Sequence, residues 1–362
     1  MKKISLCMIV RNEESSLARC LASVQSIVDE VCIVDTGSTD RTIAIANEFG
    51  ARVLERAWNH DFSAARNASL AMASGDWVLV LDADEELSNP QFARAKLERF
   101  MASDTPRLGR VLIENQANDG ECSSISITRF FPKSQAFTYC GIIHEQVSCS
   151  ETQVEHKSTG LCILHHGYAL AEPEREIKLQ RNTELLRRAL SSDPEDGYLW
   201  FQLGRTLALA DDNAGALDAL EQGLARCPDD APWGVALLET GAYALRALGR
   251  SGQALKLLSN VEVEFSQRAD TCFLIALLSM DCGQLERAER GFLHCLDLGG
   301  NKAHYTETEA AAAAATCAPA FNLGVMKEVL GDKRAAESWF RKALEFRPGH
   351  GPSTQALLRI GA

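Results

Sequence analysis

An apolar segment that ends in two acidic residues constrains the fold of this chain most. Trp77 to Leu81 is a continuous apolar run bounded by polar residues, a pattern typical of a buried strand. Asp82 and Asp84 follow it directly, separated by one small residue. Because α/β proteins bind ligands at the carboxyl ends of parallel strands, this position predicts a site. Two hard oxygen donors there suit a divalent cation and the phosphates it would carry; the alternative is a strand that ends in a solvated acidic turn.

Strands alternate with helices around this segment. Further strands are predicted at residues 4–10, 31–34, 52–54, 110–115 and 124–131. Helices are predicted at residues 17–24, from about residue 41, and at residues 62–73. This alternation implies an α/β domain with a mostly parallel, doubly wound sheet and a mixed part at its later strands. Three strand ends would deliver Asn12, Asp35 and Asp82 to one edge, where we expect a functional site.

Four sequence blocks carry a resemblance to a known family. They are residues 5–14 (SLCMIVRNEE), 34–42 (VDTGSTDRT), 61–67 (DFSAARN) and 81–85 (LDADE). The chain resembles family 2 glycosyltransferases with the GT-A fold, in which all four blocks occur in this order and spacing. Weaker matches continue to about residue 170. Similar amino-terminal halves occur in bacterial enzymes that add sugars to the lipopolysaccharide core or to secreted peptides.

The resemblance implies a role for each matched residue. Asp35 would lie beside the base and ribose of a nucleotide-sugar, with Asn12 at the neighbouring strand end, and Arg66 would face the nucleotide. Asp82 would contact the ribose or the metal. Asp84 would ligate a divalent ion, Mn²⁺ or Mg²⁺, that bridges the two phosphates and stabilises the charge of the leaving group. The alternative for Arg66 is a cation on a helix surface.

One residue departs from the family pattern. Thr36 stands where many relatives have a second acid, which often recognises uracil. Its hydroxyl can still form a hydrogen bond to a base. The resemblance therefore implies a nucleotide-sugar donor, in the first place a UDP-sugar, and leaves the base open.

A Gly-x-x-His-Glu segment follows the donor motifs. Inverting transfer needs a side chain that takes the proton of the acceptor while the acceptor attacks the anomeric carbon. Similar proteins have such a segment at about this distance from the donor site. We therefore predict Glu145 as the base and His144 as a neighbour that orients or binds the acceptor. The alternative is a surface turn with a satisfied histidine.

A later histidine completes the predicted site. His165 follows the apolar strand at residues 162–164 and matches the first position of a His-x-Gly-Tyr pattern in similar sequences. The resemblance implies that it joins Asp82 and Asp84 around the metal, and neutral imidazole suits manganese. The alternative is a strand-end histidine packed under the next helix. Whether His165 or His166 is the ligand stays open.

The second half of the chain is repetitive. After a charged amphipathic helix at residues 172–190, small residues recur with the spacing of the tetratricopeptide repeat, a pair of helices that often ends in proline. Repeat units are predicted to begin near residues 197, 235, 269 and 317. Residues 306–315, which end in six alanines, predict an extra helical turn or two inside the array. The alternative for the whole region is a generic α-helical domain.

We therefore predict two domains joined by a helix. They are a GT-A glycosyltransferase domain at residues 1–171, a connecting helix at residues 172–196, and an all-α tetratricopeptide-repeat superhelix at residues 197–362. The length of 362 residues accommodates two domains. A hydrophobic content of 46% and a charged content of 24% are typical of soluble globular proteins. No apolar run is long enough for a transmembrane helix, and the amino terminus lacks the pattern of a signal peptide.

Cysteine usage and charge narrow the possible partners. The 12 cysteines are scattered without a Cys-x-x-Cys pair, which predicts free thiols in a reducing cytoplasm and not a disulfide framework or a zinc cluster. The net charge of −12 argues against nucleic acid as a partner and offers no basic face to an anionic membrane.

Together these features predict a cytoplasmic, metal-dependent, inverting glycosyltransferase of the hexosyltransferase type. Its acceptor would be a polypeptide or a glycan or lipid-linked molecule, and the repeats would bind that acceptor or a protein partner. One alternative is a non-catalytic tetratricopeptide scaffold built on an inactive sugar-nucleotide fold. Another is a nucleotidyltransferase, which would need a glycine- and lysine-rich phosphate loop where this chain has residues 10–13 (VRNE).

Overall fold

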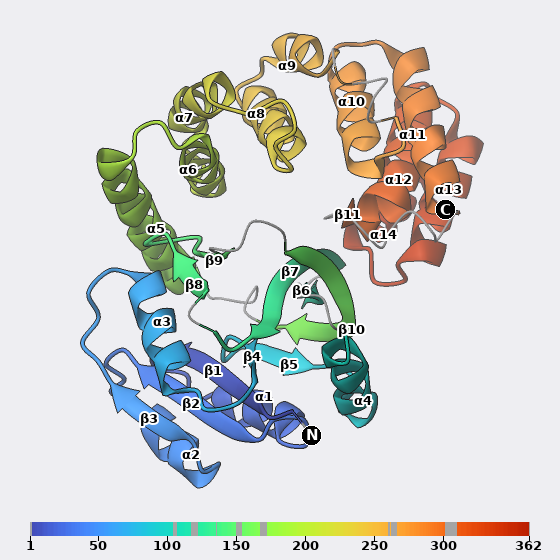
Figure 1. Cartoon of the computed structure of the whole chain (residues 1–362). Coiled ribbons are helices and arrows are strands. Elements are labelled where there is room, and N and C mark those ends of the chain that lie inside the picture. The colour runs from blue at the N-terminus through green and yellow to red at the C-terminus, as the bar shows by residue number, and fades with distance from the viewer. Residues whose placement is uncertain are drawn as a thin grey trace. The chain divides into compact units, whose positions relative to one another are not determined.

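The computed structural model shows two compact units (Figure 1). It describes residues 2–103, 107–116, 122–134, 136–149, 154–166, 172–259, 261, 266–300 and 310–361. One unit consists of residues 1–117 and 124–170, and the other of residues 118–123 and 171–362.

The first unit is built on a mixed sheet. Its strands are β1 (Ile4–Val10), β2 (Glu30–Asp35), β3 (Arg52–Glu55), β4 (Trp77–Val80), β5 (Glu85–Leu87), β6 (Arg107–Gln116), β7 (Cys122–Pro132) and β10 (Glu155–His165). They lie in the order β3-β2-β1-β4-β7-β6-β10-β5. The pairs among β1 to β4 are parallel, whereas β7 runs antiparallel to β4 and β5 antiparallel to β10. The predicted α/β class with a mostly parallel sheet is confirmed.

Helices cover both faces of this sheet. They are α1 (Leu17–Val24), α2 (Thr42–Glu48), α3 (Phe62–Met72) and α4 (Pro90–Met101). Figure 1 shows α3 in front of the sheet and α1 behind it. Alternate residues of β1 enter different cores, with Leu6 and Met8 on the α1 side and Cys7 on the α3 side. Burial of both faces explains why β1 is a continuous apolar run and not an alternating one.

A small hairpin is attached to α3. It consists of β8 (Phe137–Cys140) and β9 (Gln146–Cys149), which pair antiparallel. The Asn67 side chain both donates to the backbone oxygen of Tyr139 at 2.9 Å and accepts from its N–H at 2.8 Å. The N–H of Phe62, at the start of α3, donates to the Ile142 oxygen at 2.9 Å. These bonds fix the turn between β8 and β9 against α3.

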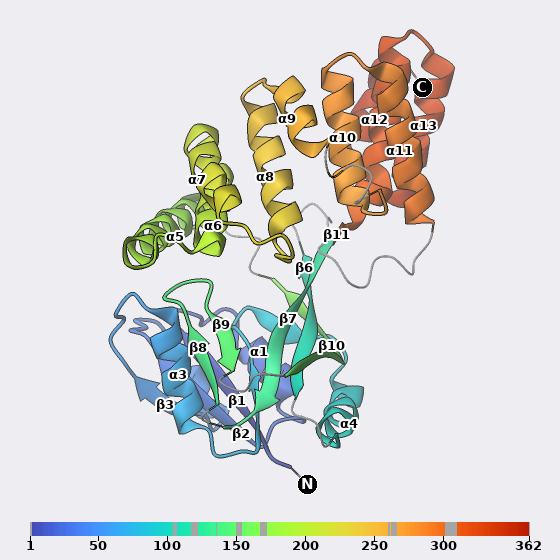
Figure 2. The same cartoon turned by 45° about the horizontal axis from the view of Figure 1, so that its top comes forward.

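The second unit is helical. It consists of α5 (Glu172–Ser192), α6 (Gly197–Leu209), α7 (Asn213–Ala225), α8 (Gly234–Ala247), α9 (Ser251–Leu258), α10 (Ala269–Asp281), α11 (Leu285–Gly299), α12 (Cys317–Val329), α13 (Lys333–Phe346) and α14 (Gly351–Ile360). Figure 2 shows these helices stacked as successive antiparallel pairs. The pairs begin at residues 197, 234, 269 and 317, at or next to the predicted positions.

Small residues allow these helix pairs to pack closely. A Cβ at Gly204 would lie 2.5 Å from Leu220 Cγ, and one at Gly324 would lie 2.5 Å from the Phe340 ring. The two glycines hold the same place in the first and last helix pairs. The small-residue pattern that predicted the repeats therefore has a steric cause.

The alanine-rich insert differs from its prediction. Ala310–Ala311 is a short strand, β11, and Ala312–Ala315 is a 3₁₀ turn, so the alanines do not extend an α-helix. Ala314 and Ala315 are buried, and Ala315 packs with Ala269 and Leu298. Tertiary packing thus overrides the helix propensity of alanine. The rest of the predicted insert, residues 306–309, lies outside the described residues.

No helix in the described part of the chain combines the length and the apolar character needed to cross a membrane.

Candidate active site

The predicted edge of the sheet is formed by the carboxyl ends of β2, β1 and β4. These strands are parallel neighbours, with Val10 paired to Asp35, and Asn12 and Asp82 follow the ends of β1 and β4. Asn12 adopts a left-handed backbone, with φ of 55°. Its Oδ1 accepts a hydrogen bond from the Thr39 N–H at 2.8 Å, which ties the loop after β1 to the loop after β2.

Asp35 is buried, and its two carboxylate oxygens differ in their contacts. Its Oδ2 accepts from the N–H groups of Gly37 and Ser38, each at 2.9 Å. Its Oδ1 has no hydrogen-bond partner among the described residues. A buried, unsatisfied acceptor costs free energy, so this oxygen is suited to a ligand hydroxyl or N–H. The Thr36 hydroxyl, by contrast, donates to the Val10 oxygen at 3.1 Å, and its predicted base contact stays a prediction.

Asp82 lies between two arginines. Its Oδ1 accepts from Arg66 Nη2 and its Oδ2 from Arg129 Nη2, both at 2.8 Å. The side chains of Arg66 and Arg129 are only 8% and 10% exposed, so Arg66 is not a surface cation. Burial opposes the ionised form, but Arg129 and Arg66 hold the pKa of the Asp82 carboxyl far below its usual range.

Arg66 also reaches the predicted base. Its Nε donates to Glu145 Oε1 at 2.5 Å, and its guanidinium carbon lies 5.6 Å from the centre of the Tyr139 ring. His144, immediately before Glu145, adopts a left-handed backbone with φ of 51°. The structure therefore brings Arg66, Asp82 and Glu145 together, and the hairpin bonds to α3 are the physical reason. Their roles in binding and transfer stay predictions.

Tyr139 contributes a buried phenol to the same cluster. Burial raises the pKa of Tyr139 to about 12, although Arg66 and Arg129 act in the opposite direction. Its hydroxyl has no hydrogen-bond partner among the described residues.

A second group forms where β5, β10 and β6 meet. His165 is paired with Glu85 across β5 and with Asn115 across β6. Its Nε2 lies 3.1 Å from Asp84 Oδ2, and its Nδ1 lies 2.8 Å from Asn115 Oδ1. Burial opposes protonation, but the bond to Asp84 raises the pKa of His165.

The neighbouring histidine has a different partner. His166 Nε2 lies 3.1 Å from Glu86 Oε2. The geometry thus favours His165 over His166 as the histidine beside Asp84.

The fit of these residues to a divalent metal is partial. Asp84 and His165 offer a carboxylate oxygen and an imidazole nitrogen side by side, a donor pair that suits Mn²⁺. Within the described ranges, however, no group of three His, Cys, Asp or Glu side chains is gathered that could hold a metal ion. Both oxygens of Asp82 are engaged by arginines instead. Its assignment as a metal ligand stays a prediction without support from the geometry.

Sequence reasoning missed Arg129, Glu85 and Asn115. Glu85 is 3% exposed, and its carboxylate accepts from Arg129 Nη2 at 3.0 Å and from the Asp82 N–H at 2.8 Å. Burial raises the pKa of Glu85 above its ordinary value even beside Arg129. A signal for Arg129 was available, since it is a lone cation directly before Phe130 and Phe131 in a predicted strand. Its partners depend on strand pairing and could not be read from the sequence.

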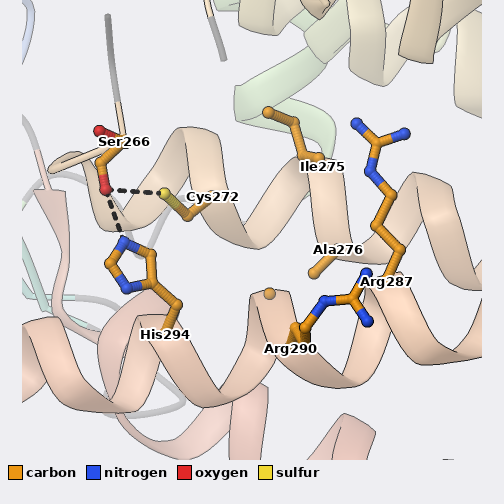
Figure 3. A pocket seen from close by; sticks show the side chains of 8 residues that line it. Ser266, Cys272, Ile275, Ala276, Arg287, Arg290 and His294 are labelled. Atoms are coloured by element: carbon orange, nitrogen blue, oxygen red, sulfur yellow. Dashed lines mark hydrogen bonds between the residues drawn. The ribbon is translucent and has the colours of Figure 1, made fainter. Parts of the chain in front are cut away.

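The helical unit contains a pocket of about 340 Å³ between α10 and α11. Figure 3 shows the side chains of Arg287 and Arg290 at one end and those of His294 and Cys272 at the other. A ring nitrogen of His294 lies 2.7 Å from the Ser266 oxygen. The pocket is lined by Ser266, Cys272, Ile275, Ala276, Arg287, Arg290, Gly291 and His294, none of which was predicted as a site residue.

A part of each unit matches a known family. Residues 5–100 match the model of glycosyl transferase family 2, and residues 320–350 match a tetratricopeptide repeat. The chain carries a family 2 glycosyltransferase domain. Both resemblances predicted from the sequence blocks are therefore confirmed, and the site described above belongs to this family 2 domain and the strands that follow it.

Three curated relatives illustrate the similarity. A TPR repeat-containing protein of Synechococcus elongatus is 38% identical over 62% of this chain and 57% of its own length. An uncharacterized glycosyltransferase of Rickettsia typhi is 44% identical over 28% of this chain and 34% of its own length. The SPbeta prophage-derived glycosyltransferase SunS of Bacillus subtilis is 28% identical over 61% of this chain and 53% of its own length. The chain thus spans about half the length of these relatives, or less.

Proposed function

We propose that this protein transfers a sugar from a nucleotide-sugar donor, in the first place a UDP-sugar, to a polypeptide or to a glycan or lipid-linked acceptor. One observation carries the proposal. At the carboxyl edge of the sheet in a family 2 domain, Asp82, Arg66 and Glu145 form a single hydrogen-bonded chain. Buried charges of this kind cost free energy and are typical of functional sites.

The donor would lie across the ends of β1, β2 and β4. The unpartnered Oδ1 of Asp35 would accept a hydrogen bond from the ribose or the base. The loop fixed by Asn12 and Thr39 would border the nucleotide. Arg66, whose guanidinium lies beside the strand end and holds Asp82, would face the nucleotide.

Glu145 would act as the general base. Arg66 holds its Oε1, which leaves Oε2 to take the proton from the acceptor. As that proton leaves, the acceptor atom forms a bond to the anomeric carbon, and the bond from that carbon to the diphosphate oxygen breaks with its electron pair. The result is inversion at the anomeric carbon. His144, next to Glu145, would orient the acceptor.

Asp84 and His165 would hold the divalent ion. A bound Mn²⁺ or Mg²⁺ would neutralise charge on the departing diphosphate. Asn115, which lies 2.8 Å from His165 Nδ1, fixes the orientation of the imidazole ring.

The helical repeats would bind the acceptor or a protein partner. Stacked helix pairs present extended surfaces suited to peptides, and the pocket with Arg287 and Arg290 offers one cationic recess for such a chain. A cytoplasmic location stays a prediction.

The test is a screen of nucleotide-sugars against the full chain with and without Mn²⁺. A donor at a hundred times its dissociation constant should stabilise the fold by about 2.7 kcal/mol, visible in a melting curve, and should be hydrolysed slowly. If the folded protein binds and hydrolyses no nucleotide-sugar with or without Mn²⁺, the proposed transfer is wrong. Tight binding of a protein partner by such an inactive chain would favour the scaffold alternative.

A further inference from the structure

Arg129 closes the turn that carries the acidic motif. One nitrogen, Nη2, donates to Asp82 Oδ2 at 2.8 Å and to Glu85 Oε1 at 3.0 Å. The turn is also closed from within, because the Asp82 N–H donates to Glu85 Oε2 at 2.8 Å and the Glu85 N–H donates to the Asp82 oxygen at 3.1 Å. Asp84 lies inside this four-residue turn.

The arginine comes from a different part of the chain. Strand β7 runs antiparallel to β4, with Phe130 paired to Leu79, so Arg129 lies beside the end of β4 where Asp82 follows. Its two carboxylate partners are 44 and 47 residues away in sequence. The strand pairing therefore anchors the turn to the interior of the sheet.

Arg129 is less exposed than the Asp82 carboxylate that it holds. Its side chain is 10% exposed and that of Glu85 is 3% exposed, whereas Asp82, on which both act, is 35% exposed. The partly exposed carboxylate of Asp82 is thus held by a buried arginine.

We propose that Arg129 is a positioning residue for the transfer reaction: it holds Asp82 and the turn to Glu85, and so sets the places of Asp84 and of the Arg66 guanidinium that shares Asp82. The inference rests on the proposed function, because it concerns the same site. If its role were purely structural, Arg129 would only neutralise the charge of the buried Glu85.

Paired substitutions separate the two roles. Arg129→Met should destabilise the fold, since it leaves the carboxylate of Glu85 buried without its cation. The double variant E85Q/R129M removes that charge and should recover most of the melting temperature. We expect its kcat for donor hydrolysis to stay about ten- to a hundredfold below the wild type, because Asp82 still lacks the hydrogen bond from Arg129 that holds it in place. Arg129→Lys, which keeps the charge with a shorter reach, should retain the melting temperature and still lose kcat.

Hydrogen exchange gives a second measurement that does not depend on activity. In E85Q/R129M, the backbone N–H groups of Asp82 and Glu85 should exchange faster than in the wild type, while those of β1 stay protected. Arg110→Met is the matched control: this arginine lies on β6, donates to the Ser126 oxygen and is exposed, so its loss should change neither exchange at the turn nor kcat.

The outcomes are distinct. Full recovery of kcat together with stability in E85Q/R129M would overturn the proposal and leave Arg129 a structural role. If the wild type hydrolyses no nucleotide-sugar, the proposed function fails, and exchange at the turn still decides about Arg129. Wild-type protection of the turn in the double variant would then overturn the positioning role, and faster exchange would support it.

Discussion

The two units of this chain bury different kinds of side chain. In the α/β unit, Arg66, Arg129 and Glu85 are buried and charged, and they meet at one edge of the sheet. Among the charged side chains that the structure describes in the helical unit, none is fully buried, and its core consists of apolar and small residues with a few uncharged polar ones. Its ion pairs include partly exposed ones such as Arg246 with Asp281, whose side chains are 36% and 26% exposed.

This difference predicts where substitutions change activity and where they change stability. Buried charges destabilise a fold unless they are paired, and clusters of them are typical of functional sites. Stacked helix pairs gain stability from contacts between neighbouring repeats, which need close packing and no buried charge. Substitutions in the first unit should therefore affect activity most, and those in the second should affect stability.

The largest effect is expected at Asp84. Asp84→Ala should lower metal-dependent transfer roughly a thousandfold, because it removes a carboxylate that would bind the ion. The melting temperature without ligand should stay near the wild type. Turnover with saturating Mn²⁺ is the measurement, and Asp218→Ala, at an exposed acid on α7, is the control. Wild-type turnover by the Asp84 variant would remove this residue from the metal site.

Glu145 should show the next largest effect. Glu145→Gln should bind the nucleotide-sugar normally and transfer at least about a hundredfold more slowly, since the amide cannot take the acceptor proton. Titration should therefore show an unchanged donor affinity, whereas kinetics with a single donor should show a reduced turnover. A parallel loss of affinity would place Glu145 in the donor site, and an unchanged rate would exclude it as the base. Glu98→Gln, at a surface ion pair, is the matched control.

Acid should weaken the α/β unit through Glu30. Burial by itself would raise the pKa of Glu30, but hydrogen bonds from Ser5, Ser74 and Gly75 lower the pKa to about 2. A depressed folded-state pKa gives stability that is present above the unfolded value near 4.5 and lost as pH falls towards about 2.

Glu30→Gln should therefore lower the free energy of unfolding by roughly 2 kcal/mol at pH 7. It should also make that free energy depend less on pH between about pH 5 and pH 2. Denaturant unfolding across this range measures it. An equally steep acid limb in the variant would assign the acid sensitivity to other carboxyls.

The smallest effects should come from the helical unit. Gly324→Ala places a Cβ 2.5 Å from the Phe340 ring and should cost about 1 to 2 kcal/mol without changing donor hydrolysis. Gly252→Ala, on α9 with nothing within 4 Å of the added carbon, should instead stabilise slightly, because alanine favours helix. Thermal unfolding of both variants tests the contrast. Loss of donor hydrolysis in the Gly324 variant would contradict the division between a unit that determines activity and a unit that contributes only stability.

Local sequence patterns predicted much of the fold. Apolar runs predicted β1, β2 and β4, and the small-residue spacing predicted where the helix pairs begin. The alanine segment is the exception, because packing beside Ala269 and Leu298 decided its form against the helix propensity of alanine.

The sequence by itself singled out Asn12, Asp35, Asp82 and the Glu145 and His165 segments, by residue type and by their place after apolar runs. Only the tertiary structure decided their partners. Strand pairing brought Arg129 to Asp82 and Asn115 to His165, and the bonds between α3 and the β8–β9 hairpin brought Glu145 to Arg66. The physical reason is that a periodic pattern reports which face of an element is buried, whereas a contact between residues far apart in sequence depends on how distant strands pair, which no local pattern encodes.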